Sequence, residues 1–337
     1  EYISRKLIKE RISDEVSDSS GKEYLRQNPE LLDNVVDIMV GKPAIDPKEL
    51  AQAVVKIISS PMDADKQDYL YRDSYFAGPK YGFIVDVDRI AHNLKIFEGK
   101  LILDMKALSA AETLIISKFE MIRWVYRHHT VCLANELMYR TILNAIEANI
   151  LCWEDFTAEG IVKNRLTDSY VVHKVRNSVE NSEKAQIARD YLKAIQNRQL
   201  LKPLWTTTTE KKNLIPAHQE ALVNRAVNEK KEDLEKQFAD KCKLFASDAI
   251  IHHSTLEAYI PPYEFPIEEE ICLQSEIGAP EKLSILSPIV YTVMHNYNEL
   301  RAFFLVYLPT TVRGNTFETK KGIAENLVKA AESVVGL

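Results

Sequence analysis

The chain has few of the residues that interrupt regular structure, with 10 glycines and 13 prolines among 337 residues. Because turn-forming residues are sparse, we expect long elements, which favours helices over a many-stranded barrel. The sequence also lacks any run of about 18 apolar residues, so we expect no membrane-spanning helix and no membrane partner.

Cysteine is also rare, and its spacing is uninformative for metal binding. The four cysteines, Cys132, Cys152, Cys242 and Cys272, lie far apart and form no C-x-x-C pair. Their spacing fits neither a zinc site nor the disulfide framework of a small secreted protein. We therefore expect four reduced thiols in a cytoplasmic protein.

Positive charge is in slight deficit, since 43 Lys and Arg residues face 49 Asp and Glu residues for a net charge of −6. Nucleic-acid-binding domains are usually basic, so we expect no dedicated nucleic-acid surface. Neither a G-x-x-x-x-G-K-[ST] nor a G-x-G-x-x-G motif is present, which excludes a P-loop and a Rossmann fingerprint. Apolar residues make up 46%, enough for a substantial core.

Hydrophobic spacing predicts a mainly α protein. Apolar residues recur every three or four positions over most of the first 205 residues, and the helices predicted there span 2–12, 30–40, 46–59, 63–75, 86–93, 109–128, 131–152, 167–178 and 182–198. Ser109 and Glu112 have the spacing of a capping box. Further helices are expected at 216–244 and 316–335, and strands at 249–253 and 301–308.

Two domains suit a chain of this length. We predict an all-helical body over 1–205 and a smaller α+β C-terminal region over 206–337, where proline and β-branched residues become more frequent. The run Thr206–Thr209 is the expected loop at the boundary.

The predicted helix that begins at Asp63 carries unusual polar residues. Asp65, Tyr69 and Asp73 lie at i, i+4 and i+8, and therefore on one face, which is a poor way to build a core. A carboxylate in the first turn is favoured in its ionised, metal-binding form, and Lys66 could neutralise a phosphate. A surface helix with paired charges is the alternative reading of the same spacing.

Residues 62–76 read MDADKQDYLYRDSYF and are followed by Gly78 and Tyr81-Gly82. This string resembles a signature of HD-domain phosphohydrolases, in the branch of deoxynucleoside triphosphate triphosphohydrolases. A second block agrees, because residues 121–128 resemble the M-x-R-x-V-Y-x-H stretch of that family, and a weaker third block spans 166–176. The resemblance covers about residues 1–200. It implies a helical HD-domain body and metal-dependent hydrolysis of deoxynucleoside triphosphates (dNTPs) to deoxynucleoside and triphosphate.

The resemblance also implies roles at the metal and the phosphates. Asp65 matches the last ligand of the metal site, whose ion would be Mg, Mn, Fe or Zn. Lys66 matches a contact to the triphosphate. Lys118 stands where the family usually has a phosphate-binding arginine, so the charge is kept and the bidentate fork is lost.

Three further residues match positions around the sugar. Tyr69 resembles a contact to the triphosphate and sugar. Asp73 resembles the carboxylate that hydrogen-bonds the sugar's 3′-hydroxyl or orders the neighbouring cationic groups. Tyr126 resembles the tyrosine that packs under the deoxyribose and excludes a 2′-hydroxyl. Lys118, Ile122 and Tyr126 recur every four residues, which places them near one helix face. The resemblance further implies a deoxynucleotide substrate, a nucleotide effector and a homo-oligomer.

The histidines depart from the family pattern. The family's metal site uses a histidine and then an adjacent His-Asp pair, yet none of the eight histidines here is followed by Asp. Residues 1–4 resemble an H-E-x-x-S segment without its histidine, so we expect the catalytic and remaining metal-binding residues upstream of residue 1. Residues 1–337 alone are then expected to hydrolyse no dNTP. His128 and His129 are consecutive, and on a helix they would diverge by about 100°.

Two other functions remain open from the sequence. The chain could be a metal-free module that binds nucleotides and acts in regulation or assembly. It could also belong to an HD phosphohydrolase that acts on another nucleotide phosphoester. A Lys66 and Lys118 pair favours a polyphosphate over a monoester.

Overall fold

A computed structural model of the chain describes residues 23–24, 27–42, 48–98, 100–164, 166–205, 216–243, 250–254, 271–275, 278–296, 303–308 and 317–336. The contacts divide the chain into two units. Unit 1 comprises Glu1–Tyr126, Ala148–Val179 and Pro261–His295, and unit 2 comprises Arg127–Glu147, Glu180–Ile260 and Asn296–Leu337. The predicted helix at 2–12 and the loop at 206–209 lie outside the described residues. The domain boundary near residue 205 stays a prediction.

Helices were predicted for most of the described helical segments of unit 1, but not for 158–164, 283–286 and 288–296. The described helices are α3 (Pro29–Met39), α4 (Lys48–Ile58), α5 (Ala64–Ala77), α6 (Val87–His92), α7 (Leu108–Met121), α9 (Ala158–Asn164), α10 (Asp168–Arg176), α13 (Leu283–Leu286) and α14 (Pro288–Asn296). Four short turns join them, namely η1 (Lys80–Ile84), η2 (Met105–Ala107), the π-helical η3 (Ile122–Tyr126) and η4 (Trp153–Phe156).

The observed helix ends confirm one predicted cap and contradict another. Asp63 caps α5 as predicted, since its carboxylate accepts a hydrogen bond from the backbone N–H of Lys66 at 2.7 Å. The capping box predicted at Ser109 is wrong, because α7 starts one residue earlier and has no side-chain cap. The α-helical part of the predicted 109–128 helix also ends early, at Met121.

Unit 1 contains a small mixed sheet that corrects the prediction of an all-helical body. Its strands are β1 (Leu94–Phe97), β2 (Lys100–Asp104), β5 (Cys272–Gln274) and β6 (Glu281–Lys282), in the order β1-β2-β5-β6. β1 pairs antiparallel with β2, and β2 pairs parallel with β5. The short β1–β2 hairpin escaped detection because its apolar residues are too few to separate a strand from a helix end.

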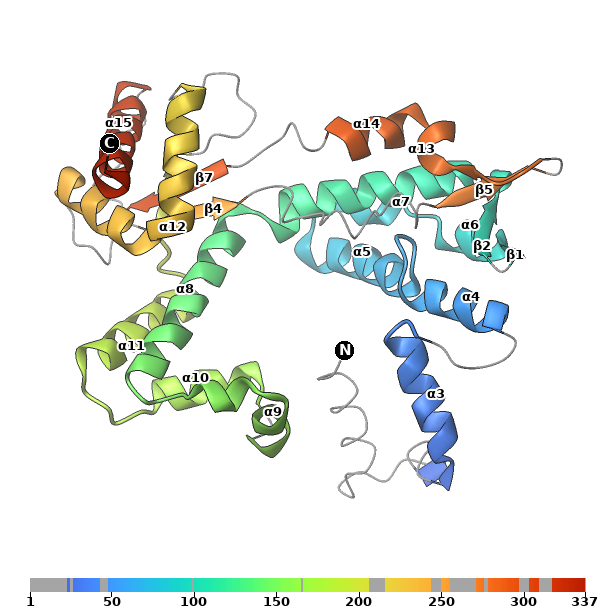
Figure 1. Ribbon diagram of the computed structural model, residues 1–337, viewed down its shortest axis with the longest axis horizontal. Helices are drawn as coiled ribbons and strands as arrows, with labels where there is room; N and C mark the ends of the chain where they lie inside the picture. The colour runs from blue at the N-terminus through green and yellow to red at the C-terminus, as the bar shows by residue number, and fades with distance from the viewer. Residues whose placement is uncertain are drawn as a thin grey trace. The chain divides into compact units, whose positions relative to one another are not determined.

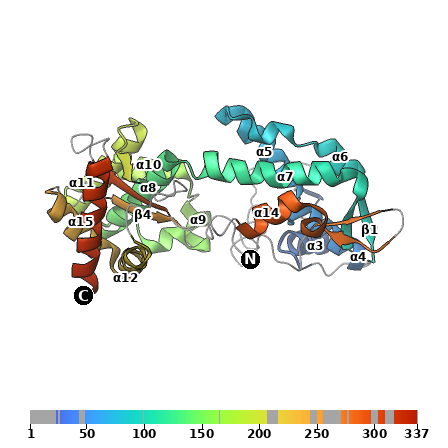
Figure 2. The same cartoon turned by 90° about the horizontal axis from the view of Figure 1, so that it is seen from above.

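The core of unit 1 forms around α7. Figures 1 and 2 show α7 lying between α5 and α13. Leu70 of α5, Leu103 of β2, and Leu114 and Met121 of α7 are at most 1% exposed and belong to one cluster. The face of α5 that contributes Leu70 is therefore fixed by hydrophobic burial.

The turn η1 packs so closely on α5 that it requires a glycine. Ser74 donates its hydroxyl to the carbonyl of Pro79 and accepts the N–H of Gly82 at 3.1 Å. A Cβ at Gly82 would lie 1.9 Å from the carbonyl oxygen of Leu70, which no side-chain rearrangement can relieve.

Gly82→Ala is expected to destabilise unit 1 by about 1–3 kcal/mol, because the backbone of η1 must move away from α5. Chemical denaturation followed by circular dichroism measures this loss. Gly78→Ala is a useful comparison, since Gly78 has open space around it and a φ of 94°, so its cost comes from backbone strain alone. Equal stability of Gly82→Ala and the wild type would contradict the close packing.

Asp104, at the end of β2, makes the stability of unit 1 depend on pH. Hydrogen bonds from Lys95 Nζ and from the backbone N–H of Lys106 lower the pKa of Asp104 from its usual value of 3.8. The folded state therefore prefers the ionised form. This stabilisation is present above pH 3.8 and is lost as the pH falls through the lower folded pKa.

We expect Asp104→Asn to flatten the acid limb of the stability curve, since asparagine cannot be protonated in this range. Unfolding free energies measured between pH 5 and the acid transition test this expectation. Asp88→Asn, at an exposed position of α6, serves as the control. An acid limb in Asp104→Asn as steep as that of the wild type would contradict the assignment.

The described residues of unit 2 form four helices and an antiparallel sheet. The helices are α8 (His129–Glu147), α11 (Glu183–Gln196), α12 (Ala217–Cys242) and α15 (Phe317–Val335). The strands β3 (Lys202–Trp205), β7 (Phe303–Leu308) and β4 (Ile250–Ser254) follow the order β3-β7-β4. Strands were predicted for β4 and β7, whereas β3 was not and so adds a second exception to the all-helical body.

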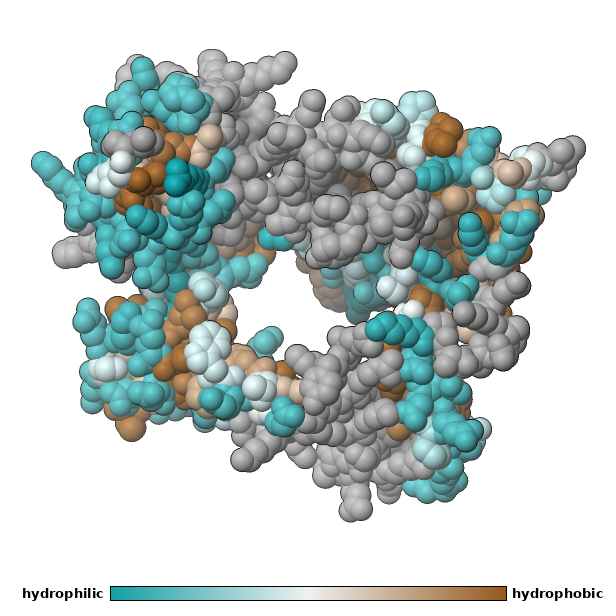
Figure 3. Space-filling model, viewed as in Figure 1, coloured by the Kyte–Doolittle hydropathy of each residue, from teal (hydrophilic) through white to brown (hydrophobic). Residues whose placement is uncertain are grey.

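The core of unit 2 lies where α12 and α15 pack together. Leu234 and Phe238 of α12 and Leu327 of α15 are fully buried in one cluster. Figure 3 shows hydrophobic residues between these two helices. The predicted fold class, mainly α with a smaller α+β part, is confirmed. Within the part of the chain that the structure describes, no helix is long and apolar enough to cross a membrane.

Candidate functional site

The candidate site is built on α5, whose start is fixed by the Asp63 cap. Asp65 follows in the first turn and is exposed. Tyr69 and Asp73 lie one and two turns further along the same face, and both are half-buried. The three side chains chosen from the sequence therefore share one face of α5, as predicted.

The structure joins this face to a segment far along the chain. The hydroxyl of Tyr126 donates a hydrogen bond to Asp73 Oδ2 at 2.8 Å. The rings of Tyr69 and Tyr126 meet edge to face, with centroids 6.0 Å apart and planes inclined by 68°. Tyr69, Asp73 and Tyr126 thus form one cluster, here called the tyrosine–aspartate cluster.

Tyr126 reaches this cluster from the π-helical turn η3, which directly follows α7. A π-type turn holds more residues than an α-helical turn and changes the direction in which the following side chains point. Such turns recur at functional sites. No sequence signal predicted this turn, because periodicity over five residues cannot separate it from an α-helix.

The environment keeps Tyr126 protonated. Burial and the neighbouring carboxylate of Asp73 together raise the pKa of Tyr126 far above its usual value of 10. The phenol is therefore a permanent hydrogen-bond donor at physiological pH. Its ring can act as a rigid wall and its hydroxyl as the group that orients Asp73.

The two predicted phosphate-binding lysines have different surroundings. Lys66 Nζ pairs with Asp63 Oδ2 at 2.6 Å, and its side chain is 21% exposed. The sequence did not reveal this pair, although an i, i+3 spacing of opposite charges is a usable signal. Lys118 lies on α7 and is 3% exposed, so its ammonium group lies inside unit 1. The roles of both lysines toward phosphates stay predictions.

The histidine pair differs from its expected geometry. His128 precedes α8 and is not helical, whereas His129 is the first residue of α8. Their ring centroids lie only 4.0 Å apart. The predicted divergence of about 100° is wrong because it assumed that both residues belong to one helix.

Few of the described side chains lie close enough together to bind a metal ion. Among the described residues, no group of three or more His, Cys, Asp or Glu side chains could hold a metal. Asp65 offers a single exposed carboxylate, and one ligand cannot hold a catalytic ion. The described residues therefore do not fit a metal site by themselves. The residues at 1–4 that suggested an upstream histidine lie outside them.

Comparison with known proteins identifies relatives. Residues 85–321, more than half of the chain, match the family described as HD associated region. The chain is 33% identical over 136 residues to the uncharacterized protein MJ1154 of Methanocaldococcus jannaschii, covering 37% of the chain and 30% of that protein. It is 36% identical over 91 residues to the uncharacterized protein YwfO of Bacillus subtilis, covering 27% and 21%. The matches thus span less than a third of these curated relatives.

Known structures share the fold. A hypothetical protein from Aquifex aeolicus superposes with a TM-score of 0.59 at 20% identity, covering 96% of this chain and 74% of that one. A phosphohydrolase from Bacteroides thetaiotaomicron superposes with a TM-score of 0.56 at 17% identity, covering 88% and 73%. At these identities the likeness concerns the fold alone.

Proposed function

The chain belongs to the family of HD-associated regions, and from that premise we propose that it is part of an HD-type phosphohydrolase that acts on dNTPs. The observation that carries the proposal is the tyrosine–aspartate cluster. Two sequence blocks that separately resemble the dNTP triphosphohydrolases meet in it, through a hydrogen bond between residues 53 positions apart. The alternative reading of α5, a surface helix with only local charge pairs, does not explain the hydrogen bond between Tyr126 and Asp73.

In the proposed reaction a water oxygen bonds to the α-phosphorus while the bond from phosphorus to the 5′-oxygen breaks. The products are triphosphate and deoxynucleoside, whose 5′-oxygen takes up the proton. Asp65 is the residue of this chain that would contribute a ligand to a divalent metal, whose chemistry when bound is to activate water. The part assigned to this chain is to bind the sugar and phosphates.

The sugar would lie against the ring of Tyr126. A rigid ring leaves no room for a 2′-hydroxyl, and burying that hydroxyl without a partner costs free energy. Asp73 can accept a hydrogen bond from the 3′-hydroxyl through the carboxylate lone pairs that Tyr126 does not use. Lys66 and Lys118 are the cations proposed for the phosphates.

Nucleotide titration of residues 1–337 tests the proposal. By calorimetry, we expect dGTP to bind more tightly than both GTP and dGMP, because only dGTP combines a triphosphate with a sugar that lacks the 2′-hydroxyl. Equal affinity for dGTP and dGMP would favour an HD phosphohydrolase for another phosphoester. Equal affinity for dGTP and GTP would contradict the sugar site. Triphosphate release, assayed with each of Mg, Mn, Fe and Zn, is expected to remain at the background level.

A further inference from the structure

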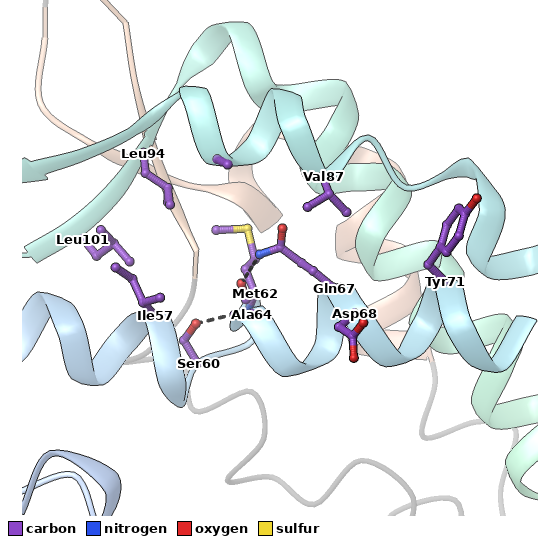
Figure 4. Close-up of a pocket in the computed structure, with 11 residues that line it drawn as sticks. Ile57, Ser60, Met62, Ala64, Gln67, Asp68, Tyr71, Val87, Leu94 and Leu101 are labelled. Carbon is purple, nitrogen blue, oxygen red and sulfur yellow. Dashed lines mark hydrogen bonds between the residues drawn. The ribbon is translucent and has the colours of Figure 1, made fainter. Parts of the chain in front are cut away.

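A pocket of about 450 Å³ lies beside α5 (Figure 4). The elements α4, α5, α6, β1 and β2 of unit 1 surround it. Most of its wall is aliphatic, including Ile57, Met62, Val87, Leu94 and Leu101. This volume lies within the range of known small-molecule sites, about 300–1,000 Å³.

The pocket is separate from the candidate site. From α5 it uses Ala64, Gln67, Asp68 and Tyr71, none of which belongs to the predicted site. At about 100° per residue, the centre of this group lies roughly 150° around the helix from the face of Asp65, Tyr69 and Asp73. A ligand here would contact the opposite side of α5.

The side-chain amide of Gln67, which lines the pocket, has a hydrogen-bond acceptor that no described residue uses. Gln67 is 9% exposed, and its Nε2 donates to the carbonyl oxygen of Met62 at 2.6 Å. This bond fixes the orientation of the amide, so the remaining atom is the acceptor Oε1. Among the described residues nothing donates to Oε1, which points toward the space between Val87 and Leu94 in Figure 4.

A second polar group, the hydroxyl of Ser60, lines the pocket just after the end of α4. Ser60 Oγ accepts the backbone N–H of Met62 at 3.2 Å, shown as a dashed line in Figure 4. The hydroxyl hydrogen is then available to a ligand, since no described residue accepts it. The pocket thus combines one acceptor with one donor in a mostly apolar wall.

The charges around the pocket exclude an anion. Among the residues that the structure describes, its lining contains no Lys, Arg or His. The charged lining residue, Asp68, is exposed and pairs with Arg72 on the surface of α5. A phosphate would therefore lose its hydration without meeting a cation in the lining.

We propose that this pocket is a second ligand site, which binds an uncharged, mainly apolar ring compound that donates one N–H to Gln67 Oε1. The site is independent of the proposed hydrolysis. An aliphatic wall contributes affinity through burial of the ring, and the unused acceptor contributes selectivity for a donor.

Three probes of similar shape test this site in residues 1–337. Indole has one N–H, indene has the same rings without it, and indole-3-acetate adds a negative charge. We expect saturable binding of indole in spectra of the ¹⁵N-labelled protein, with shifts in α5 and α6. Indene should bind roughly three- to tenfold more weakly, as the loss of one hydrogen bond implies, and indole-3-acetate more weakly than indole. Absence of saturable indole binding overturns the site, and equal affinity for indene overturns the role of Gln67.

Two variants separate ligand binding from folding. Gln67→Met keeps the side-chain length and removes the acceptor, so the preference for indole over indene should disappear.

Because Gln67 also binds the carbonyl of Met62, Gln67→Met could unfold the protein, and Ala91→Phe provides the second test. Ala91 is exposed and lines the pocket, so phenylalanine can fill the space without entering the core. Indole binding should be lost in Ala91→Phe and kept in Ala77→Phe, an exposed control on α5 outside the lining. Unchanged indole affinity in Ala91→Phe would overturn the proposal.

Discussion

Replacing Arg140 with alanine is expected to lower the free energy of unfolding by about 3–5 kcal/mol, the cost of leaving a buried carboxylate without its partner. Arg140 Nη2 donates to both carboxylate oxygens of Glu235, at 2.7 and 2.8 Å, and its Nε donates to Glu136 at 3.0 Å. Glu235 is 4% exposed and also accepts the backbone N–H of Ile251 at 2.9 Å. The Arg140–Glu235 pair therefore joins α8, α12 and β4, since Glu235 also binds β4 through Ile251.

Electrostatics within this network favour the charged guanidinium. Burial alone would lower the pKa of Arg140, but the carboxylates of Glu235 and Glu136 raise it by more, so the pKa of Arg140 lies above its usual value. Lys231 Nζ also contacts Glu136 at 2.7 Å. In Arg140→Ala, Lys231 remains as a partner of Glu136. Most of the lost stability therefore comes from the Glu235 carboxylate, which no longer has an ion-pair partner in Arg140.

Urea denaturation measures the loss of unfolding free energy in Arg140→Ala, and two further variants test whether the unpaired Glu235 carboxylate causes it. Arg225→Ala removes an arginine from an exposed pair with Glu229 and should cost only about 0.5 kcal/mol or less. The double variant Arg140→Met with Glu235→Leu removes both charges and should recover much of the stability lost in Arg140→Ala. A loss below about 1 kcal/mol in Arg140→Ala would show that water reaches Glu235 in the folded state.

The sequence predicted those features that depend on neighbouring residues. Asp63 could be identified as a cap because an aspartate before a helical pattern is a local signal, and the structure confirms it. The strand β7 could also be identified, since the sequence places a proline directly after it and it is rich in large apolar residues. In both cases the information lies within about ten residues.

Features that depend on distant residues could not be predicted in the same way. The network of Arg140, Glu136 and Glu235 joins residues 95 positions apart, and no spacing rule relates them. The prediction that Lys118, Ile122 and Tyr126 lie near one face assumed a continuous α-helix. Because residues 122–126 are π-helical, side chains after Met121 point in other directions than in an α-helix, and an eight-residue spacing does not place Lys118 and Tyr126 on one face. Resemblance to a family, rather than periodicity, brought Tyr126 and Asp73 together before the structure did.

Tyr126→Ala is expected to reduce the preference for dGTP over GTP by roughly tenfold or more, because removing the ring opens space for the 2′-hydroxyl. The ring lies against Tyr69, and its hydroxyl is bonded to Asp73 at 2.8 Å. Tyr126→Phe is the matched control, since it keeps the ring and removes only the hydrogen bond. It should retain the preference and weaken the binding of both nucleotides.

Calorimetric affinities and melting temperatures, measured together, separate this role from a purely structural one. If Tyr126 only fills the core, Tyr126→Ala lowers the melting temperature and leaves the ratio of dGTP to GTP affinity unchanged. The pH dependence adds a second criterion. Because burial and Asp73 raise the pKa of Tyr126 far above 10, the phenol stays protonated, and the wild-type ratio should be constant between about pH 7 and 9. A ratio that changes with an apparent pKa in this interval would contradict the assignment of discrimination to the neutral Tyr126 ring.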